Sequence, residues 1–300
     1  MKNINRKKLR TTLIAFLVLS PALLIAIIFV YYPSLSVLQL SFFDWDMISP
    51  DKTPVGLANY ASIFAPGSEF WNSLLRTLEY GLIYIPLSLI SGLMLAKLLT
   101  GVKRFEGFFQ SIYFIPSVTS ISVIAIIWSY IYNPQIGPLQ HLLTQLGIPA
   151  EMIPNWLSDP RFALSSLAVT SAWQSLGLVT LLFVAGLNNI PQSIYDAADV
   201  DGTSGWIKFW KITLPLLSPT TYFVFFMLII DSFRVFGIVS IMTRGRPVGS
   251  TNVLLYYVYQ NAFQYFDAGI ASAASMVIFL FIMVFMIFQQ KLGEKSVFYQ

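Results

Sequence analysis

The chain has 300 residues, of which 56% are apolar or aromatic and only 11% are charged, with a formal net charge of +4. A soluble domain is about 45–50% apolar and about 25% charged, so this composition predicts an integral membrane protein and excludes soluble enzymes, secreted modules and nucleic-acid binders. The sequence has no cysteine and one histidine, His141, which excludes disulfides, thiolate metal sites and most histidine chemistry.

Six charge-poor segments are long enough to cross a bilayer, because about 20 apolar helical residues span its hydrocarbon core. In chain order they cover residues 12–32, 71–98, 108–132, 162–187, 216–241 and 268–290. We therefore expect an all-α membrane protein, with a cytoplasmic N-terminal segment at residues 1–11 and a six-helix domain at residues 12–300. The first apolar stretch is longer than that of a signal peptide and lacks a small-residue cleavage site, so we interpret it as a retained span.

Lysine and arginine near the span ends predict the orientation, because cytoplasmic loops carry an excess of them. With a cytoplasmic N terminus, twelve lie in cytoplasmic segments and four in external segments. The twelve are Lys2, Arg6, Lys7, Lys8, Arg10, Lys97, Lys103, Arg104, Lys208, Lys211, Lys291 and Lys295. The four are Lys52, Arg161, Arg244 and Arg246. We therefore expect both termini in the cytoplasm.

One cytoplasmic segment, residues 188–215 (the 188–215 loop), is too long and too patterned for a simple connection. Ser193 stands three residues before Asp196, which resembles a capping box at a helix start. Ala197–Ala198 then follow, and Gly202 can take the positive φ that ends a helix. This pattern predicts a short helix that closes at Gly202.

A second short helix is expected in the same loop, with Trp206, Phe209 and Trp210 on one face and with Pro215 as its end. One interpretation is an interfacial helix that lies in the lipid headgroups with its aromatic side chains down. The other is a contact with another protein, since the small side chains of Ala197–Ala198 permit close approach. The spacing alone leaves both open.

The run Asp196-Ala-Ala-Asp-Val-Asp-Gly202, followed by Leu214-Pro215, resembles the EAA loop of ABC importer permeases, with Asp in place of the usual Glu. Weaker matches lie at Val55–Tyr60, Phe114–Pro116, Asn133–Pro134 with Gly137, and Thr243–Pro247, where Arg246 replaces a second glycine. The whole chain is similar to the carbohydrate-uptake branch, which includes the maltose and glycerol-phosphate permeases.

This resemblance implies a type I ABC importer permease in a bacterial or archaeal cytoplasmic membrane, with lipid around its spans. It implies three kinds of protein partner: a second and different permease chain, two ATP-binding subunits, and an extracytoplasmic solute-binding protein. The loop would couple to the ATPase through Asp196, Ala197, Ala198, Gly202, Leu214 and Pro215. The chain contains no G-x-x-x-x-G-K-[ST] motif, so we expect no enzyme activity, no metal and no cofactor of its own, and ATP with Mg²⁺ on the partner subunits.

Polar residues inside spans are candidate substrate contacts, because burying them in a bilayer is costly. Asp231 and Arg234 on the fifth span form either a self-neutralising intrahelical pair or part of a polar cavity; the resemblance favours the cavity, and Ser232 lies beside them. Arg76 and Glu79 have the same spacing, and we expect a structural pair there.

The fourth span carries a second polar group, Ser171 with Trp173-Gln174-Ser175, and the third span adds Ser117. An amide and an aromatic ring suit a sugar, although interhelical packing is the alternative for these residues. We expect the protein to pass a neutral mono- or oligosaccharide from the binding protein to the cytoplasm by alternating access. The alternative is a stand-alone secondary transporter of a small polar solute, against which the absence of an internal repeat argues. No sequence motif supports an intramembrane enzyme.

Overall fold

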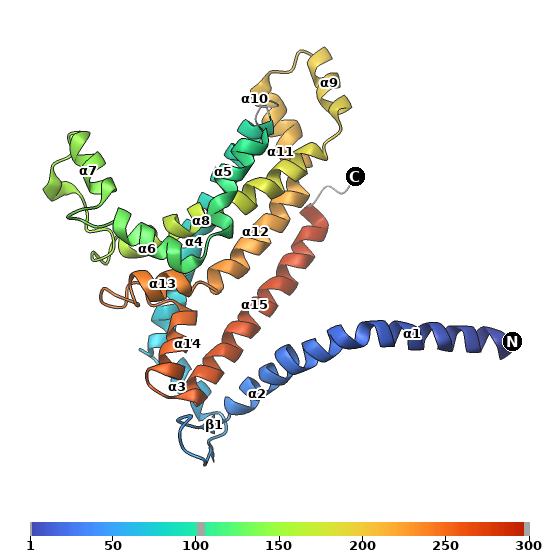
Figure 1. The fold of residues 1–300 in the computed structure, drawn as a ribbon, viewed down its shortest axis with the longest axis vertical. Helices are drawn as coiled ribbons and strands as arrows, with labels where there is room; N and C mark the ends of the chain where they lie inside the picture. The colour runs from blue at the N-terminus through green and yellow to red at the C-terminus, as the bar shows by residue number, and fades with distance from the viewer. Residues whose placement is uncertain (1, 101–105, 297–300) are drawn as a thin grey trace. The chain divides into compact units, whose positions relative to one another are not determined.

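The structure is a computed structural model that describes residues 2–100 and 106–296, and it is helical over most of that length (Figure 1). The long helices are α1 (Lys2–Ala26), α4 (Glu69–Thr100), α8 (Ala163–Asn188), α12 (Ser218–Phe233) and α15 (Ala268–Ser296). The shorter helices are α2 (Tyr32–Leu40), α3 (Ala58–Phe64), α5 (Glu106–Val118), α6 (Ile121–Ile131), α7 (Pro138–Gln145), α9 (Gln192–Val200), α10 (Gly205–Lys208), α11 (Leu214–Leu216), α13 (Gly237–Met242) and α14 (Leu254–Phe263). Irregular turns complete the helical part, with π-helical turns at Ile27–Tyr31 and Phe209–Thr213 and a 3₁₀ turn at Ala150–Met152. Two short strands, β1 (Phe43–Asp44) and β2 (Thr53–Pro54), pair antiparallel.

Five helical segments of the described residues are long and apolar enough to cross a membrane, and a bent helix pair raises the number to as many as six. The five are Thr11–Leu40, Glu69–Thr100, Ala163–Asn188, Ser218–Met242 and Ala268–Gln289. The bent pair is Ser111–Val118 with Ile121–Ile131. The all-α membrane architecture predicted from composition is therefore confirmed, with the two-residue strands as a small unpredicted addition.

The third expected span is not one continuous helix, because the chain bends by 106° between α5 and α6. Ser120 between them has ψ of 135°, which is outside the helical range. Pro116 lies four residues earlier and lacks the N–H that would bond to the preceding turn. The polar residues Ser117, Thr119 and Ser120 lie at this bend, so the sequence carried a local signal that the prediction of one continuous span did not use.

The fifth expected span is also interrupted, since α12 ends at Phe233 and α13 begins at Gly237. Phe236 between them has φ of −142° and ψ of −56°, which breaks the helical backbone. The interruption falls beside Asp231 and Arg234, the two charged residues of this span. Non-helical backbone at this depth is tolerated where it lines a cavity.

The chain divides into two compact units, and the first comprises residues 1–66 and 258–277. In this unit the Asn59 amide donates hydrogen bonds of 3.0 Å to the Ser41 carbonyl and 2.9 Å to the Phe43 carbonyl. A Cβ on Gly269 would lie 2.3 Å from the Phe43 carbonyl oxygen, so only glycine permits this approach. The start of α15 is thereby held against β1 and α3.

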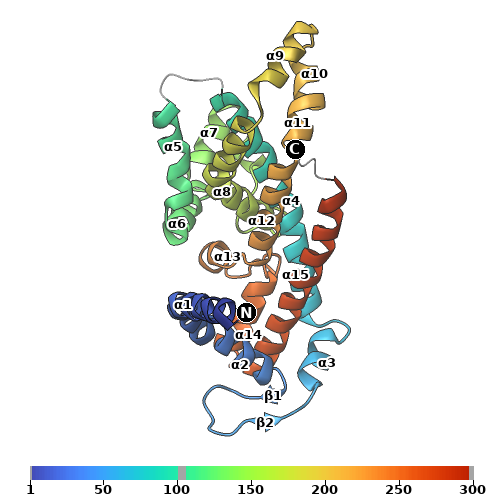
Figure 2. The ribbon, with the colours of Figure 1, turned by 90° about the vertical axis from the view of Figure 1, so that its right-hand side faces the viewer.

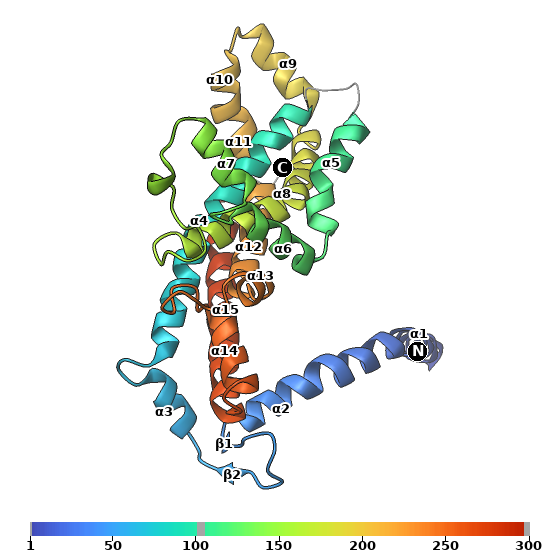
Figure 3. The ribbon, with the colours of Figure 1, turned by 60° about the vertical axis from the view of Figure 1, so that its left-hand side comes forward.

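The second unit comprises residues 67–257 and 278–300 and contains the polar residues expected to bind substrate. Within it α4 packs against both α8 and α12 (Figures 2 and 3). A Cβ on Gly92 would lie 2.4 Å from a Val179 methyl carbon, and one on Gly81 would lie 3.3 Å from the Ser232 hydroxyl. Small residues let the helices approach this closely, as is typical of membrane interfaces.

Candidate functional site

A cavity of about 390 Å³ opens at the point where α12 breaks, between α4, α5, α8 and the α12–α13 junction. Its polar lining comprises Tyr80 and Tyr84 from α4, Ser117 from α5, Ser171, Gln174 and Ser175 from α8, and Asp231 and Arg234 at the end of α12. Its apolar lining comes from Ile121, Leu178, Val235, Phe236, Gly237 and Ile238. We call it the span cavity. Six of the eight residues expected to bind substrate therefore line one space.

Asp231 and Arg234 both line the span cavity. The ion pairs of the described residues are Arg76–Glu79, Arg161–Asp159 and Lys208–Asp199, and Asp231 and Arg234 do not form one. Arg234 is the residue directly after α12, and its N–H still donates to the Ile230 carbonyl at 3.2 Å, so the two residues share the last turn although their charged groups do not pair. This geometry favours the cavity interpretation over the self-neutralising pair.

The α8 residues of the span cavity differ in how fully their polar atoms are used. Ser171 donates to the Leu167 carbonyl at 3.0 Å, and Ser175 lies 3.2 Å from the Ser88 hydroxyl. The Gln174 side chain makes no hydrogen bond to another described residue. Both the carbonyl oxygen and the NH₂ group of its amide can therefore bind a ligand. Among the uncharged residues of the span cavity, Gln174 is therefore the strongest candidate for substrate contact.

Two expected contact residues lie outside the span cavity. The Trp173 ring packs edge-on against Trp128, with ring centroids 5.6 Å apart, and this is the packing alternative considered for it. Ser232 is buried, donates to the Ile229 carbonyl at 2.7 Å and lies against Gly81. Both residues join helices and do not border the space that a substrate could enter.

Ser117 lines the span cavity and also joins α5 to α8. Its hydroxyl donates to the Gln174 carbonyl at 2.8 Å and accepts from the Leu178 N–H at 3.2 Å. With both contacts made inside the protein, the Ser117 hydroxyl has little left to offer a ligand. Its main role is in packing.

Sequence reasoning missed Tyr80 and Tyr84, which line the span cavity and are both buried. Their rings stack with centroids 5.5 Å apart and an interplanar angle of 18°. Tyrosines four residues apart in a span share one helical face, and this spacing was the available signal. Stacked phenol rings add an aromatic wall, which suits the C–H face of a sugar.

Helices α9 and α10 project beyond the ends of α8 and α12, and with the π-helical turn at Phe209–Thr213 they form most of the 188–215 loop (Figure 1). Gly202 between them has φ of +67°, and the Thr203 N–H donates to the Ala198 carbonyl at 3.0 Å. The positive φ explains the glycine, because other residues pay a steric cost in this conformation. Asp196 and Ala197 are exposed, whereas Ala198 is only 6% exposed and is covered by its own chain. Of the two alanines, only Ala197 is exposed.

Two local expectations for the 188–215 loop were wrong. No capping box forms, since α9 begins at Gln192 after Pro191, and Asp196 instead accepts a hydrogen bond from the Gln192 amide. Pro215 does not end the second helix, because it occupies an early position of α11, where a missing N–H costs nothing. The helical path therefore continues from α10 almost to α12.

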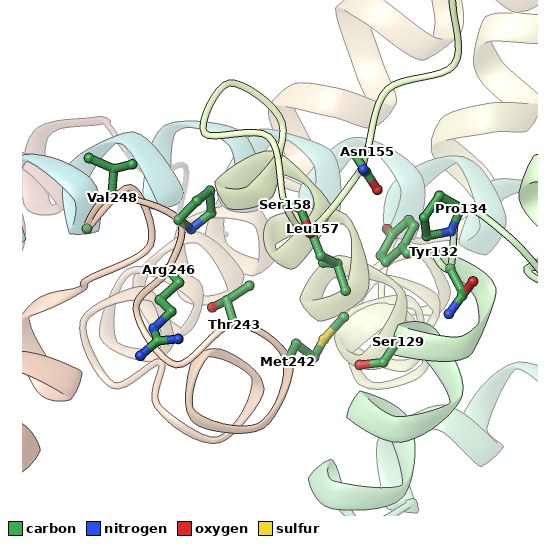
Figure 4. A pocket seen from close by; sticks show the side chains of 13 residues that line it. Ser129, Tyr132, Pro134, Asn155, Leu157, Ser158, Met242, Thr243, Arg246 and Val248 are labelled. Carbon is green, nitrogen blue, oxygen red and sulfur yellow. The ribbon is translucent and has the colours of Figure 1, made fainter. Parts of the chain in front are cut away.

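A larger cavity of about 810 Å³ lies at the other end of this unit, between α6, the loop before α8 and the turn after α13 (Figure 4). Tyr132, Asn155 and Leu157 border it on one side, and Thr243 and Arg246 on the other. We call it the outer cavity, since the charge pattern of the sequence predicts that this end lies outside the cell. Two weak sequence matches far apart in the chain, at residues 133–137 and 243–247, both contribute to its lining.

The Arg246 departure from the expected second glycine has a local explanation. The positive φ values of this turn fall on Arg244, Gly245, Val248 and Gly249, at 54°, 76°, 49° and 69°, and not on position 246. The turn is closed by Thr251, whose hydroxyl donates to the Arg246 carbonyl at 2.8 Å. A side chain is therefore accommodated at Arg246, and it reaches the outer cavity (Figure 4).

Residues 85–296 match the family described as binding-protein-dependent transport system inner membrane component. The chain belongs to this family. The matched region includes the whole 188–215 loop and every residue of the span cavity except Tyr80 and Tyr84.

Curated relatives of this permease are identical to it at about a third of the aligned positions. It is 34% identical to the probable ABC transporter permease protein YurN of Bacillus subtilis, over 93% of this chain and 95% of the relative. It is 31% identical to the sn-glycerol-3-phosphate transport system permease protein UgpA of Agrobacterium fabrum, over 96% and 97%. It is also 31% identical to the trehalose/maltose transport system permease protein MalF of Thermococcus litoralis, over 97% of each chain.

A solved structure with the same fold is a bacterial alginate ABC transporter in complex with a periplasmic protein that holds an alginate pentasaccharide. The two chains superpose with a TM-score of 0.82 at 20% identity, over 96% of each chain. The permease thus has the fold of an ABC importer permease. The family membership confirms the resemblance derived from the EAA-like loop.

Proposed function

We propose that this permease passes a neutral mono- or oligosaccharide from an extracytoplasmic binding protein into the cytoplasm by alternating access. The observation that carries the proposal is the span cavity, which brings Gln174, Asp231 and Arg234 together with two stacked tyrosines. Its volume of about 390 Å³ lies within the range of small-molecule sites, about 300–1,000 Å³. The named substrates of the relatives, a phosphorylated polyol and two disaccharides, support a carbohydrate-like solute.

The charge balance of the span cavity favours a neutral substrate. One carboxylate and one guanidinium line it, and their charges cancel. Hydroxyls of a sugar can donate to Asp231 and accept from Arg234, while an aromatic wall takes the apolar face of the ring. A strongly anionic sugar would leave the Asp231 carboxylate opposed by a like charge.

Energy would come from partner subunits that bind ATP with Mg²⁺, in an assembly of two unlike permeases and two ATPases. We place Asp196 and Ala197 at the ATPase contact, because both side chains are exposed on α9. Gly202 would set the bend, Ala198 would hold α9 against its own chain, and Leu214 and Pro215 would transmit movement into α12. The outer cavity would face the binding protein, with both termini on the cytoplasmic side.

The test is uptake by the assembled transporter of a panel of labelled neutral sugars, uronates and sugar phosphates. We expect a neutral sugar to be preferred, and Gln174→Ala to raise KM for it about three- to tenfold, the value of one hydrogen bond. Ser165→Ala is the matched control, since Ser165 is on the same helix, donates only to the Phe162 carbonyl and does not line the cavity. Preference for a uronate or a phosphate would overturn the neutral substrate, and unchanged uptake by the Gln174 variant would remove that residue from the site.

A further inference from the structure

Two adjoining pockets lie where the end of α4 meets the second half of the 188–215 loop. The first, the apolar groove, has a volume of about 760 Å³ and is lined mainly by Ile90, Met94, Leu98, Trp206, Trp210 and Leu214. The second, the polar pocket, has a volume of about 390 Å³ and includes Thr100, Tyr195, Asp199, Lys208 and Thr213. Lys97 and Phe209 line both, so the two spaces share a wall.

The shared wall holds a positive charge at the junction of the two spaces. The Lys97 ammonium lies 4.0 Å from the centre of the Phe209 ring, a cation–π contact that orients it. Among the described side chains, no carboxylate forms an ion pair with Lys97. Lys208, in contrast, is paired with Asp199. Counting the described residues, the polar pocket therefore carries one uncompensated positive charge.

The hydroxyl groups of the polar pocket are engaged within the protein. The Tyr195 and Thr213 hydroxyls bond to each other at 3.1 Å, Thr213 also donates to the Lys208 carbonyl at 3.4 Å, and Thr100 donates to the Lys97 carbonyl at 3.1 Å. Among the described side chains of this pocket, the Lys97 ammonium is therefore the donor left for a ligand, and an ammonium suits phosphate oxygens. The charge of the pocket thus matches a singly charged phosphodiester.

The apolar groove is open and presents large side chains to its surroundings. Trp206 is 72% exposed and Leu98 is 68% exposed. Exposed tryptophans next to lysines are typical of the interface between lipid tails and headgroups. The charge pattern of the sequence places this end of the protein at the cytoplasmic leaflet, where anionic lipids are concentrated.

We propose that these pockets bind one anionic phospholipid of the cytoplasmic leaflet. An acyl chain lies in the apolar groove, and the phosphodiester lies beside Lys97 in the polar pocket. The lipid thereby braces α10 against α4 and steadies the 188–215 loop. This assigns the Trp206, Phe209 and Trp210 face to lipid, and it leaves the exposed face of α9 for a protein partner.

Tryptophan quenching by brominated lipids tests the proposal, with the full chain reconstituted in nanodiscs. Dibromo-phosphatidylglycerol is compared with dibromo-phosphatidylcholine at equal mole fraction. The contribution of the site to quenching is the difference in quenched tryptophan fluorescence between wild type and a Trp206→Phe/Trp210→Phe variant. This variant keeps the groove aromatic. We expect the phosphatidylglycerol analogue to quench this contribution more strongly.

Charge variants locate the selectivity. Lys97→Gln should weaken the preference for phosphatidylglycerol about fivefold, the effect of one lysine near a membrane surface. Lys211→Gln is the matched control, because Lys211 is exposed on the same stretch of loop and lines neither pocket. It should leave the preference unchanged.

Three outcomes would overturn the proposal. Equal quenching by the two brominated lipids would show that the site does not select for the anionic headgroup. Equal losses in the Lys97 and Lys211 variants would indicate a diffuse surface attraction. Loss of the quenching when the partner subunits assemble would show that the groove is a protein interface, occupied by a partner's side chains.

Discussion

Gly177 lies where α5 and α8 come closest, and its contacts explain why no larger residue stands there. A Cβ at this position would lie 2.6 Å from the Tyr113 carbonyl oxygen and 2.8 Å from the Phe114 Cα. Both are backbone atoms, which cannot rotate away. The neighbouring Ser117 joins the same two helices through hydrogen bonds to α8. One wall of the span cavity thus depends on this close approach.

Gly177→Ala should therefore destabilise the permease, by about 1–3 kcal/mol as for overpacked cores. Gly205→Ala is the control, because no atom lies within 4 Å of its Cβ position. Thermal unfolding of the two variants in one detergent measures the difference. A Gly177 variant as stable as the Gly205 variant would contradict the close packing of α5 on α8.

Asp231 gives a second prediction at the scale of single residues, and it rests on the charge balance of the span cavity. Asp231→Asn removes the negative charge and leaves the positive charge of Arg234. Uptake of anionic sugars should therefore rise relative to uptake of neutral ones. We expect a change on the order of tenfold in the uptake ratio of a uronate to its parent sugar. Asp231→Glu keeps the charge and should keep the ratio. An unchanged ratio in the Asn variant would place Asp231 away from the substrate.

At the scale of elements, the 188–215 loop depends on a bend that only some residues can make. A Cβ at Gly202 would meet nothing within 4 Å, so side-chain size is no obstacle to substitution. The obstacle is the φ of +67°, which Asn adopts far more readily than a β-branched residue. The bend sets the angle between α9 and α10.

Gly202→Val should therefore abolish uptake while the protein still inserts in the membrane, and Gly202→Asn should keep most of it. Uptake normalised to the amount of inserted permease measures both. If the Val variant transports like wild type, the bend has no role in coupling. If both variants fail equally, the site senses side-chain size in the assembled complex rather than backbone conformation.

For the whole molecule, we expect ATP-driven uptake to depend on partner subunits, because the sequence contains no G-x-x-x-x-G-K-[ST] motif. We expect the tagged permease to co-purify from its native membrane with an ATP-binding subunit and with a second permease. The ATPase activity of that complex should rise when a sugar-loaded binding protein is added. A permease that transports in vesicles without any ATP-binding subunit would instead act as a secondary transporter.

The sequence predicts much of the architecture, because the cost of placing charges in a bilayer is a local property of each segment. Charge-poor runs therefore indicate the apolar helices without any knowledge of their packing. Gly202 was also predictable, since a helix that must turn sharply favours glycine. The bends at Ser120 and Phe236 were not predicted, although polar residues lie beside both, because polar residues can also be accommodated within a continuous helix.

The sequence predicts the helical membrane fold, the family and the polar residues available within the spans. Which of these residues face one space follows from the packing of the helices, because it depends on how each helix is rotated about its axis. In the structure, Tyr80 and Tyr84 line the same cavity as Gln174, whereas Trp173 and Ser232 make packing contacts between helices. The physical reason is that a polar group in a span can be satisfied by a neighbouring helix or by a cavity, and local sequence does not distinguish the two.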